Sequence, residues 1–107
     1  MELNIGIKDV HKRVEDSDIL ILLDENGKQF NSIEFSGFLE KLQHSGGKRI
    51  LFIIGDAYGF DEELYKRAQH KISLSLMTFT HQMVRLIFLE QFYRAMTILK
   101  NESYHNP

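Results

Sequence analysis

Two short runs of apolar residues stand out along the chain. Residues 19–23 and 50–54 contain no polar side chain, and such runs are typical of strands buried on both faces of a parallel sheet. Asp24 closes the first run, and residues 25–28 (Glu-Asn-Gly-Lys) have the chemistry of a turn, while Gly55 follows the second run. We therefore predict two interior strands, each ending at a turn.

Amphipathic helical patterns follow both runs. In the first, apolar side chains recur at three- and four-residue spacing, at Phe35, Phe38, Leu39 and Leu42. Asn31 or Ser32 can cap this helix, with Glu34 in capping-box position, and the glycine pair 46–47 can end it. A second helix is predicted after Gly59, because residues 61–63 are acidic and residues 66–67 basic, an order that complements the helix dipole.

The period of the pattern changes within the stretch from Lys71 to Met96. Ile72, Leu74 and Leu76 alternate with Ser73, Ser75 and Met77, which predicts a half-buried strand over residues 71–77. From Gln82 onward apolar residues recur at helical spacing, so we predict a loop and then a long helix with Thr80 as its N-cap.

Two further segments complete the pattern. Residues 86–89 are four apolar residues in a row, more than one face of a surface helix can bury. Either a second partner surface covers them, or a central helix packs on two sides within one domain. Near the start, Ile7, Val10 and Val14 suggest a short amphipathic helix within residues 5–15, preceded by a tail without an anchor.

The order of these elements predicts one domain with an α/β fold, a mostly parallel sheet with crossover helices. Ligands of such sheets bind beyond the C-terminal ends of the strands. Here those ends are Leu23-Asp24, Gly55-Asp56 and the residues from Leu76 to Phe79. Taken singly, the leucines could be ordinary core residues and Gly55 only a turn.

Composition narrows the picture to an ordinary globular chain. Of the 107 residues, 43% are hydrophobic and 26% charged, with a net charge of −2 and no cysteine. The absence of cysteine removes disulfides and thiolate metal sites. The near-neutral charge argues against a protein that holds naked nucleic acid by charge alone. Because no apolar run could span a bilayer and the N-terminus has no signal-peptide pattern, we expect a cytoplasmic protein without a membrane partner.

Four ordered motifs carry a resemblance to a known family. They are Leu22-Leu-Asp-Glu-Asn-Gly-Lys, then Ile53-Ile-Gly-Asp-Ala-Tyr-Gly-Phe, then Leu74-Ser-Leu-Met-Thr-Phe continued by Thr80-His-Gln-Met-Val-Arg, and finally Glu90-Gln-Phe-Tyr-Arg-Ala with Tyr104-His. Over roughly residues 14 to 105 the chain resembles the ribosomal RNA large subunit methyltransferase H family, which belongs to the SPOUT class of trefoil-knotted methyltransferases.

The resemblance implies a threaded C-terminal helix, a homodimer with sites at its interface, and S-adenosylmethionine as cofactor at the strand ends. By matching position, the cofactor contacts would be Leu23, Gly55, Leu74, Ser75, Leu76, Met77, Thr78 and Phe79. Adenine would lie between apolar side chains with its edge paired to backbone groups, and Gly55 would permit close approach of the chain.

The implied reaction is methyl transfer to N3 of a pseudouridine in large-subunit (23S) ribosomal RNA within the ribosome. The cofactor's sulfonium supplies an activated methyl group, so the protein mainly aligns the nucleophile and favours loss of the N3 proton, and no metal is needed. Arg94 could hold a phosphate or base oxygen. Tyr104 and His105 could reach the partner subunit's site, with His105 as a candidate proton acceptor. His81 is expected to orient the loop through a hydrogen bond.

The chain departs from the family pattern at two places. Family members begin with an additional strand and helix, and the first dozen residues of this chain do not match the family clearly. Asp56 stands where the family usually has a second glycine. Its carboxylate and its narrower range of backbone angles are expected to weaken cofactor binding.

Two functions stay open at this stage. One is a ribosomal RNA methyltransferase active as a homodimer on an assembled ribosome. The other is a truncated, non-catalytic paralogue or fragment that keeps the knotted dimeric core without methylating RNA. A plain nucleotide-binding α/β module is a distant third, because the sequence contains no phosphate-cradling loop.

Overall fold

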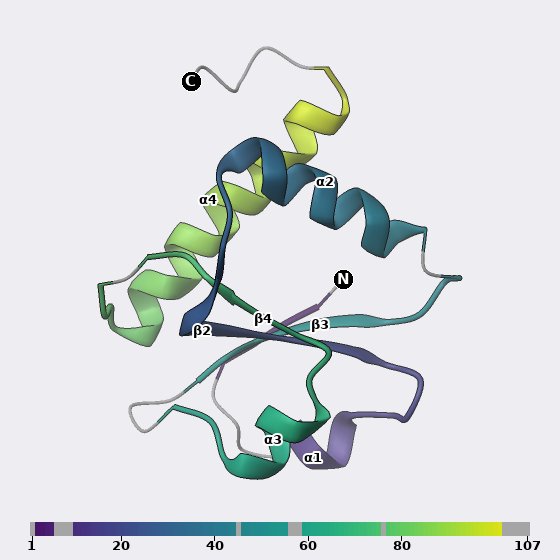
Figure 1. The fold of residues 1–107 in the computed structure, drawn as a ribbon, viewed down its shortest axis with the longest axis vertical. Helices are drawn as coiled ribbons and strands as arrows, with labels where there is room; N and C mark the ends of the chain where they lie inside the picture. Colours follow the sequence, from purple (N-terminus) through teal and green to yellow (C-terminus); the bar gives the residue numbers. More distant parts are fainter. Residues whose placement is uncertain (1, 6–9, 45, 56–58, 76, 102–107) are drawn as a thin grey trace.

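A four-stranded parallel sheet lies at the centre of the chain (Figure 1). The computed structural model describes residues 2–5, 10–44, 46–55, 59–75 and 77–101. In chain order the elements are β1 (Glu2–Ile5), α1 (Val10–Arg13), β2 (Ile19–Gln29), α2 (Ser32–Gln43), β3 (Ile50–Ile54), α3 (Glu62–Arg67), β4 (His70–Ser73) and α4 (His81–Leu99). The strands are ordered β1-β3-β2-β4, which confirms the predicted parallel α/β architecture.

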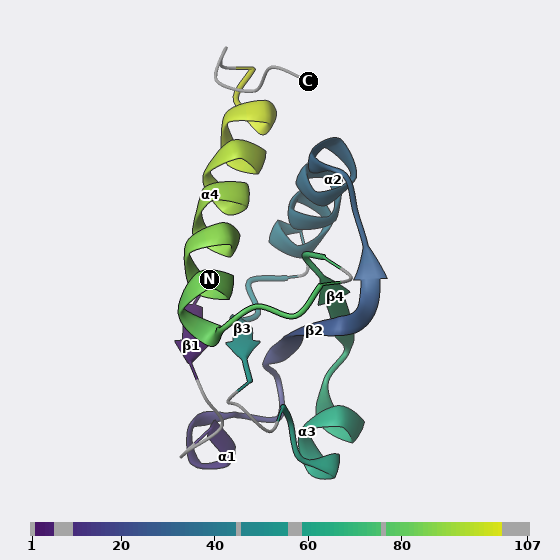
Figure 2. The same ribbon diagram turned by 90° about the vertical axis from the view of Figure 1, so that its left-hand side faces the viewer.

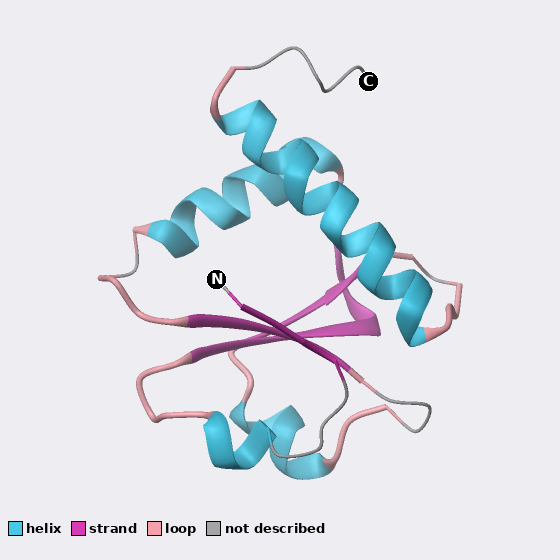
Figure 3. Cartoon of the chain, turned by 180° about the vertical axis from the view of Figure 1, so that it is seen from behind, coloured by secondary structure: helices cyan, strands magenta, loops and turns pink. Residues whose placement is uncertain are grey.

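Helices cover both faces of this sheet. Figure 1 shows α2 and α4 above the sheet and α1 and α3 below it, and Figures 2 and 3 show the same layers from two other sides. Among the described residues, no helix combines the length and the apolar character needed to cross a membrane.

Alternate residues of β2 and β3 fill two separate cores, as expected for strands buried on both faces. Ile19, Ile21 and Leu23 of β2 pack with α2 and α4, whereas Leu20 and Leu22 pack with α1 and α3. All five are buried. Residues 19–23 are all apolar because each of them is buried in one of these two cores.

An aromatic cluster fixes α4 over β3. The Phe88 side chain, 2% exposed, has its ring centroid 4.7 Å from that of Phe52 in β3 and 6.2 Å from that of Phe35 in α2. Phe92, one turn further along α4, lies 5.9 Å from Phe88. Since the helix begins next to the loop that follows β4, this packing determines where that loop ends.

Local capping signals predicted the helix starts. The Asn31 side chain accepts from the Glu34 amide at 2.8 Å while the Glu34 carboxylate accepts from the Asn31 amide at 2.9 Å, so the capping box of α2 is confirmed. Thr80 caps α4 by accepting from the Met83 amide at 3.3 Å, as predicted.

Three predictions about strands are wrong. Residues 2–5 are not a free tail but form β1, paired in parallel with β3. Residues 25–28 are not a simple turn, because β2 continues to Gln29 after an irregularity. The last strand, β4, ends at Ser73 instead of near Met77. Ser73 is buried, not exposed as alternation suggests, and its hydroxyl donates to the Ser75 carbonyl at 2.8 Å.

A polar cluster holds the opposite end of the sheet, where β2 begins. The buried Asp18 carboxylate accepts from the Arg49 guanidinium at 2.7 and 3.1 Å and from the Glu15 amide at 2.7 Å. Arg67 donates to the carbonyls of Glu15 and Asp18, each at 2.9 Å. The hydrogen bonds from Arg49, followed by that from Glu15, lower the pKa of the Asp18 carboxyl.

Candidate functional site

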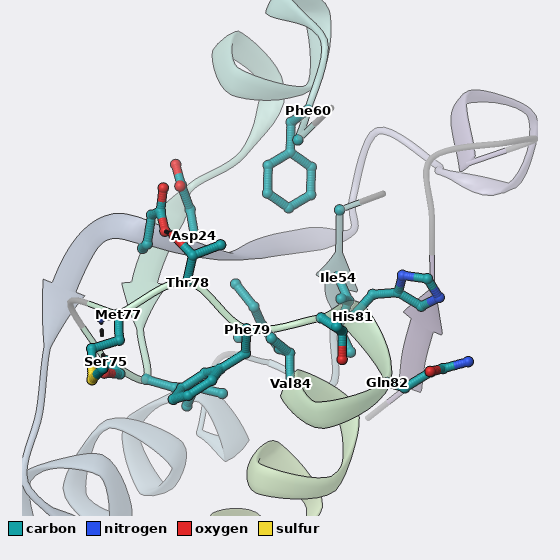
Figure 4. Close-up of a pocket in the computed structure, with 16 residues that line it drawn as sticks. Asp24, Ile54, Phe60, Ser75, Met77, Thr78, Phe79, His81, Gln82 and Val84 are labelled. Carbon is teal, nitrogen blue, oxygen red and sulfur yellow. Dashed lines mark hydrogen bonds between the residues drawn. The ribbon is translucent and has the colours of Figure 1, made fainter. Parts of the chain in front are cut away.

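A pocket of about 440 Å³ lies where β3 and β4 end and α4 begins, beside the irregular middle part of β2 (Figure 4). The strand-end rule for parallel sheets predicts a site at this edge. Its lining comes from Leu23, Asp24 and Glu25 of β2, Ile54, Gly55, Gly59 and Phe60 at and after β3, Leu74, Ser75, Met77, Thr78, Phe79 and Thr80 after β4, and His81, Gln82 and Val84 of α4. Three segments distant in sequence, residues 23–25, 54–60 and 74–84, thus contribute to one concave surface.

The structure brings together all the predicted cofactor contacts that it describes. Leu23, Gly55, Leu74, Ser75, Met77, Thr78 and Phe79 all line the pocket. Leu76, the remaining predicted contact, lies outside the described residues, as does Asp56. The predicted grouping is therefore a property of the fold as well as of the motif order.

One wall of the pocket is apolar. Ile54 is buried at the end of β3, Val84 is half-buried on α4, and Phe79 adds aromatic surface from the loop after β4. Figure 4 shows the Phe79 and Val84 side chains close to one another. A planar heterocycle can lie against such a wall while backbone groups of the loop pair with its polar edge.

Gly55 has a structural role in this wall. A Cβ on Gly55 would lie 3.1 Å from the Gly59 carbonyl carbon and oxygen, and Gly59 itself has φ of +79°. The two glycines therefore allow the backbones of Gly55 and Gly59 to lie close together. At Gly55, the backbone that lies close is that of Gly59 in the same chain.

The wall opposite is acidic. Asp24 and Glu25 line the pocket from the irregular part of β2, and the Glu25 carboxylate accepts a hydrogen bond from the Thr78 hydroxyl. The phenol pKa of Tyr65 in α3 is raised, first by burial and then by a hydrogen bond to the Asp24 carboxylate. The pocket therefore combines apolar surface with negative charge.

The loop between β4 and α4 forms the rim of the pocket. Its Met77 amide donates to the Ser75 hydroxyl at 3.0 Å, and Thr80 ends it as the cap of α4. His81, expected to orient this loop, is an exposed lining residue at the first position of α4. The helix cap and the serine hydroxyl thus shape the loop locally.

Of the three predicted catalytic residues, the structure describes only Arg94, which does not join this group. Arg94 lies on α4, 13 residues beyond His81 and thus about 20 Å along the helix axis. It does not line the pocket of its own chain, and its guanidinium pairs with Glu90 at 2.6 Å. Tyr104 and His105 lie outside the described residues.

The sequence prediction missed several lining residues, most notably Glu25 and Phe60. Glu25 directly follows the predicted strand end, so the strand-end rule could have included it had the segment not been assigned to a turn. Phe60 follows a glycine turn and has no local signal of this kind. Only the folded arrangement places it opposite the loop after β4.

Fold and pocket together define a class: α/β domains that bind a ligand at the carboxyl ends of a parallel sheet. Among solved structures, the fold resembles Archaeoglobus fulgidus Nep1, determined bound to S-adenosylhomocysteine, with a TM-score of 0.52 and 20% identity. That match covers 75% of this chain and 34% of the other. Residues 3–105 match the family model described as predicted SPOUT methyltransferase, and the chain belongs to this family.

Curated relatives agree with this assignment. The chain is 63% identical over 93 residues to ribosomal RNA large subunit methyltransferase H of Christiangramia forsetii, and 59% identical over 95 residues to the protein of that name in Parabacteroides distasonis. These matches cover 87% and 89% of the chain but only 59% and 60% of the relatives. The resemblance read from the motifs is confirmed.

Proposed function

We propose that the chain is an S-adenosylmethionine-dependent methyltransferase domain that acts on N3 of a pseudouridine in large-subunit ribosomal RNA. One observation carries the cofactor part of this proposal: the described residues expected to contact the cofactor, from three separate segments, converge on one pocket. The names of the relatives support the choice of RNA substrate. Such a reaction would take place on the ribosome, in the cytoplasm.

The pocket suits this cofactor in size and chemistry. Its volume of about 440 Å³ falls within the usual range for small-molecule sites. The wall formed by Ile54, Phe79 and Val84 can take the adenine ring, and the backbone of residues 74–79 can pair with its edge. The acidic side at Asp24 and Glu25 favours a ligand that carries positive charge, as this cofactor does at its sulfonium and ammonium groups.

When bound, the cofactor supplies an activated methyl group, so the chain's own residues need to bind, orient and exclude water. The apolar wall would hold the adenosine part and the loop 77–80 would close over it. Arg94 would orient the RNA by contacting a phosphate or base oxygen, and His105, beside Tyr104, would accept the proton from the base nitrogen.

Titration calorimetry with S-adenosylmethionine and S-adenosylhomocysteine tests the cofactor site. The parent chain should bind both in the micromolar range, and Val84→Trp, which fills the apolar wall, should remove binding. Ile33→Trp is the matched control because Ile33 is 57% exposed on α2 and does not line the pocket. Thermal melts of both variants check that the fold is kept. Failure of the folded parent chain to bind either ligand would refute the assignment.

We further propose that the chain works as a homodimer through α4. Met83, Leu86, Leu89 and Tyr93 follow one another at helical spacing along this helix and are all exposed, Leu86 most of all at 61%. A contiguous apolar face of this kind is typical of an interface. In a dimer, Arg94 and the residues after α4 could serve the partner's pocket, which would explain why Arg94 is remote from the pocket of its own chain.

Light scattering of the parent chain and of Leu86→Glu tests the dimer. We expect twice the chain mass for the parent and a shift toward the monomer mass for the variant. Ile33→Glu is the control, since Ile33 has nearly the same exposure, at 57%, on α2. A monomeric parent, or a Leu86→Glu variant that stays dimeric, would rule out this interface.

The trefoil knot implied by the family is part of the same proposal. β4 lies at one edge of the sheet and α4 packs over β3, so the connecting chain must pass β2, which lies between these two strands (Figure 2). A crossing of this kind is compatible with a threaded C-terminal helix. If the helix is threaded, refolding from the fully denatured, unthreaded chain should include a slow phase in which the helix is threaded again. A chain that is unfolded but still threaded should refold without this phase.

A second candidate function follows from length. The chain spans about three fifths of the curated relatives it matches, so it could keep the cofactor site and the dimer without methylating RNA. Transfer of tritium from labelled cofactor to ribosomes that lack the modification separates the two. Incorporation at the expected nucleotide supports the methyltransferase, whereas cofactor binding without incorporation supports the non-catalytic alternative.

A further inference from the structure

A bulge-like shift of register in β2 over residues 24–27, called the bulge below, places acidic side chains at the pocket. Leu23 and Lys28 both pair with Ile72 of β4, so residues 24–27 project from the strand opposite a single partner. The Asn26 amide donates to the Asp24 carboxylate at 3.3 Å within this bulge. Bulges of this kind commonly redirect side chains beside functional sites.

Gly27 holds the bulge against its neighbour. A Cβ at this position would lie 2.6 Å from the Lys71 carbonyl carbon and 2.7 Å from the Ile72 nitrogen, both backbone atoms of β4. No residue with a side chain fits there without moving the strand. The bulge therefore has a defined position, and Glu25 is carried to a defined place at the pocket wall.

Glu25 is hydrogen-bonded to the loop on the other side. Its carboxylate accepts from the Thr78 hydroxyl, a contact between residues 53 positions apart. Figure 4 shows Thr78 beside the Asp24 side chain of β2. Among the described residues, the other hydrogen bonds of residues 77–80 are local, to the Ser75 hydroxyl and within the first turn of α4. Of the hydrogen bonds that the described residues 77–80 make, only the one between Thr78 and Glu25 connects this loop to a strand of the sheet.

We propose that Glu25 is a positioning residue, which holds the loop 77–80 through Thr78 in the conformation that forms the pocket. The inference rests on the proposed function, since it assigns the pocket to the cofactor, but the contact itself exists in the ligand-free chain. A hydrogen bond to a carboxylate is stronger than one between neutral groups. When only a fraction of the molecules has the loop in its binding conformation, the apparent affinity for the ligand is reduced by that fraction.

Two readouts test the proposal. Hydrogen exchange of the amides of residues 77–83 reports the loop without any ligand, and calorimetry with S-adenosylhomocysteine reports the pocket. Glu25→Ala and Thr78→Val should each speed exchange in the loop and weaken binding about tenfold. The double variant should be no weaker than either single one, because both remove the same contact. Thr78→Ser, which keeps the hydroxyl, should behave as the parent.

Glu40→Ala is the matched control, since Glu40 is exposed on α2 and does not line the pocket. It should change neither readout. Melting temperatures of the Glu25 and Thr78 variants should stay near that of the parent, because both side chains are exposed.

Three results would overturn the proposal. Unchanged loop exchange in Thr78→Val would show that the bond does not hold the loop. Weaker binding in Glu25→Ala alone, with Thr78→Val normal, would mean that Glu25 contacts the ligand directly. A fall in the melting temperature of Glu25→Ala large enough to explain its weaker binding would mean that Glu25 only stabilises the fold. If the parent chain binds no ligand, the proposed function fails, and the exchange data alone decide on Glu25.

Discussion

Alanine at Gly27 and alanine at Gly37 should change the stability of this chain in opposite directions. A Cβ at Gly27 would lie 2.6, 2.7 and 2.8 Å from three backbone atoms of Lys71 and Ile72, whereas ordinary contact begins at 3.4 Å. Because backbone atoms cannot swing aside as a side chain can, β4 must move away from β2. Overpacking of this kind costs about 1–3 kcal/mol.

Gly37 offers the contrasting case within the same chain. It lies in the middle of α2 and is exposed, and a Cβ added there would meet no neighbouring atom within 4 Å outside its own helix backbone. Alanine there removes the entropic cost of a helical glycine, so the free energy of unfolding should rise by about 1 kcal/mol. Together the two substitutions should differ by about 2–4 kcal/mol.

Urea denaturation at one fixed protein concentration measures both effects, since a dimer's stability depends on concentration. The slope against urea should not change, so the midpoint alone carries the result. Parent-like stability of Gly27→Ala, with the expected gain at Gly37→Ala, would refute the close packing of the bulge on β4. Gly27→Ala should also weaken cofactor binding, because Glu25 moves with the bulge.

Three further predictions concern charged residues. Asp18→Asn should lower the urea midpoint at neutral pH and make the midpoint fall less steeply in acid. The reason is that the pKa of Asp18 is lowered chiefly by Arg49, so the carboxylate stabilises the fold above the ordinary carboxyl pKa. This stabilisation is lost as pH falls through the lowered value. His11→Gln should have the opposite pH dependence, because the hydrogen bond to Asp61 raises the pKa of His11. That contact stabilises below the ordinary histidine pKa and is lost as pH rises through the raised value, so the variant should lose stability only on the acid side, in melts at about pH 5 and pH 9. Asp56→Gly should bind S-adenosylmethionine more tightly in calorimetry, and equal affinities would remove Asp56 from the account of the site.

Features fixed by local chemistry could be predicted from the sequence. The capping box of α2, the Thr80 cap of α4 and the apolar strand β3 each depend on residues close together in the chain. The course of β2 beyond Leu23 does not. Glu-Asn-Gly-Lys is equally good in a turn and in a bulge, and the pairing of Lys28 with Ile72 decides between them.

The candidate site divides in the same way. The strand-end rule and the motif order placed Leu23, Gly55 and the loop 77–79 at one pocket, because strand direction fixes which ends meet. The link from Glu25 to Thr78 joins segments that only the folded sheet brings together. Arg94 failed to join the pocket for a geometric reason: a straight helix carries its fourth turn away from a site at its first.

The run Leu86 to Leu89 shows how one helix can serve the core, the pocket and an interface at once. Phe88 is 2% exposed against β3, while Leu86 and Leu89 on either side of it face away from the core and are exposed. The two alternatives for this run were packing on two sides of one domain and a partner surface. The described chain covers Phe88 and leaves Leu86 and Leu89 exposed, so this face is available to the proposed dimer. Because the first turn of α4 lines the pocket, such a dimer would bring the partner's surface to the edge of the site.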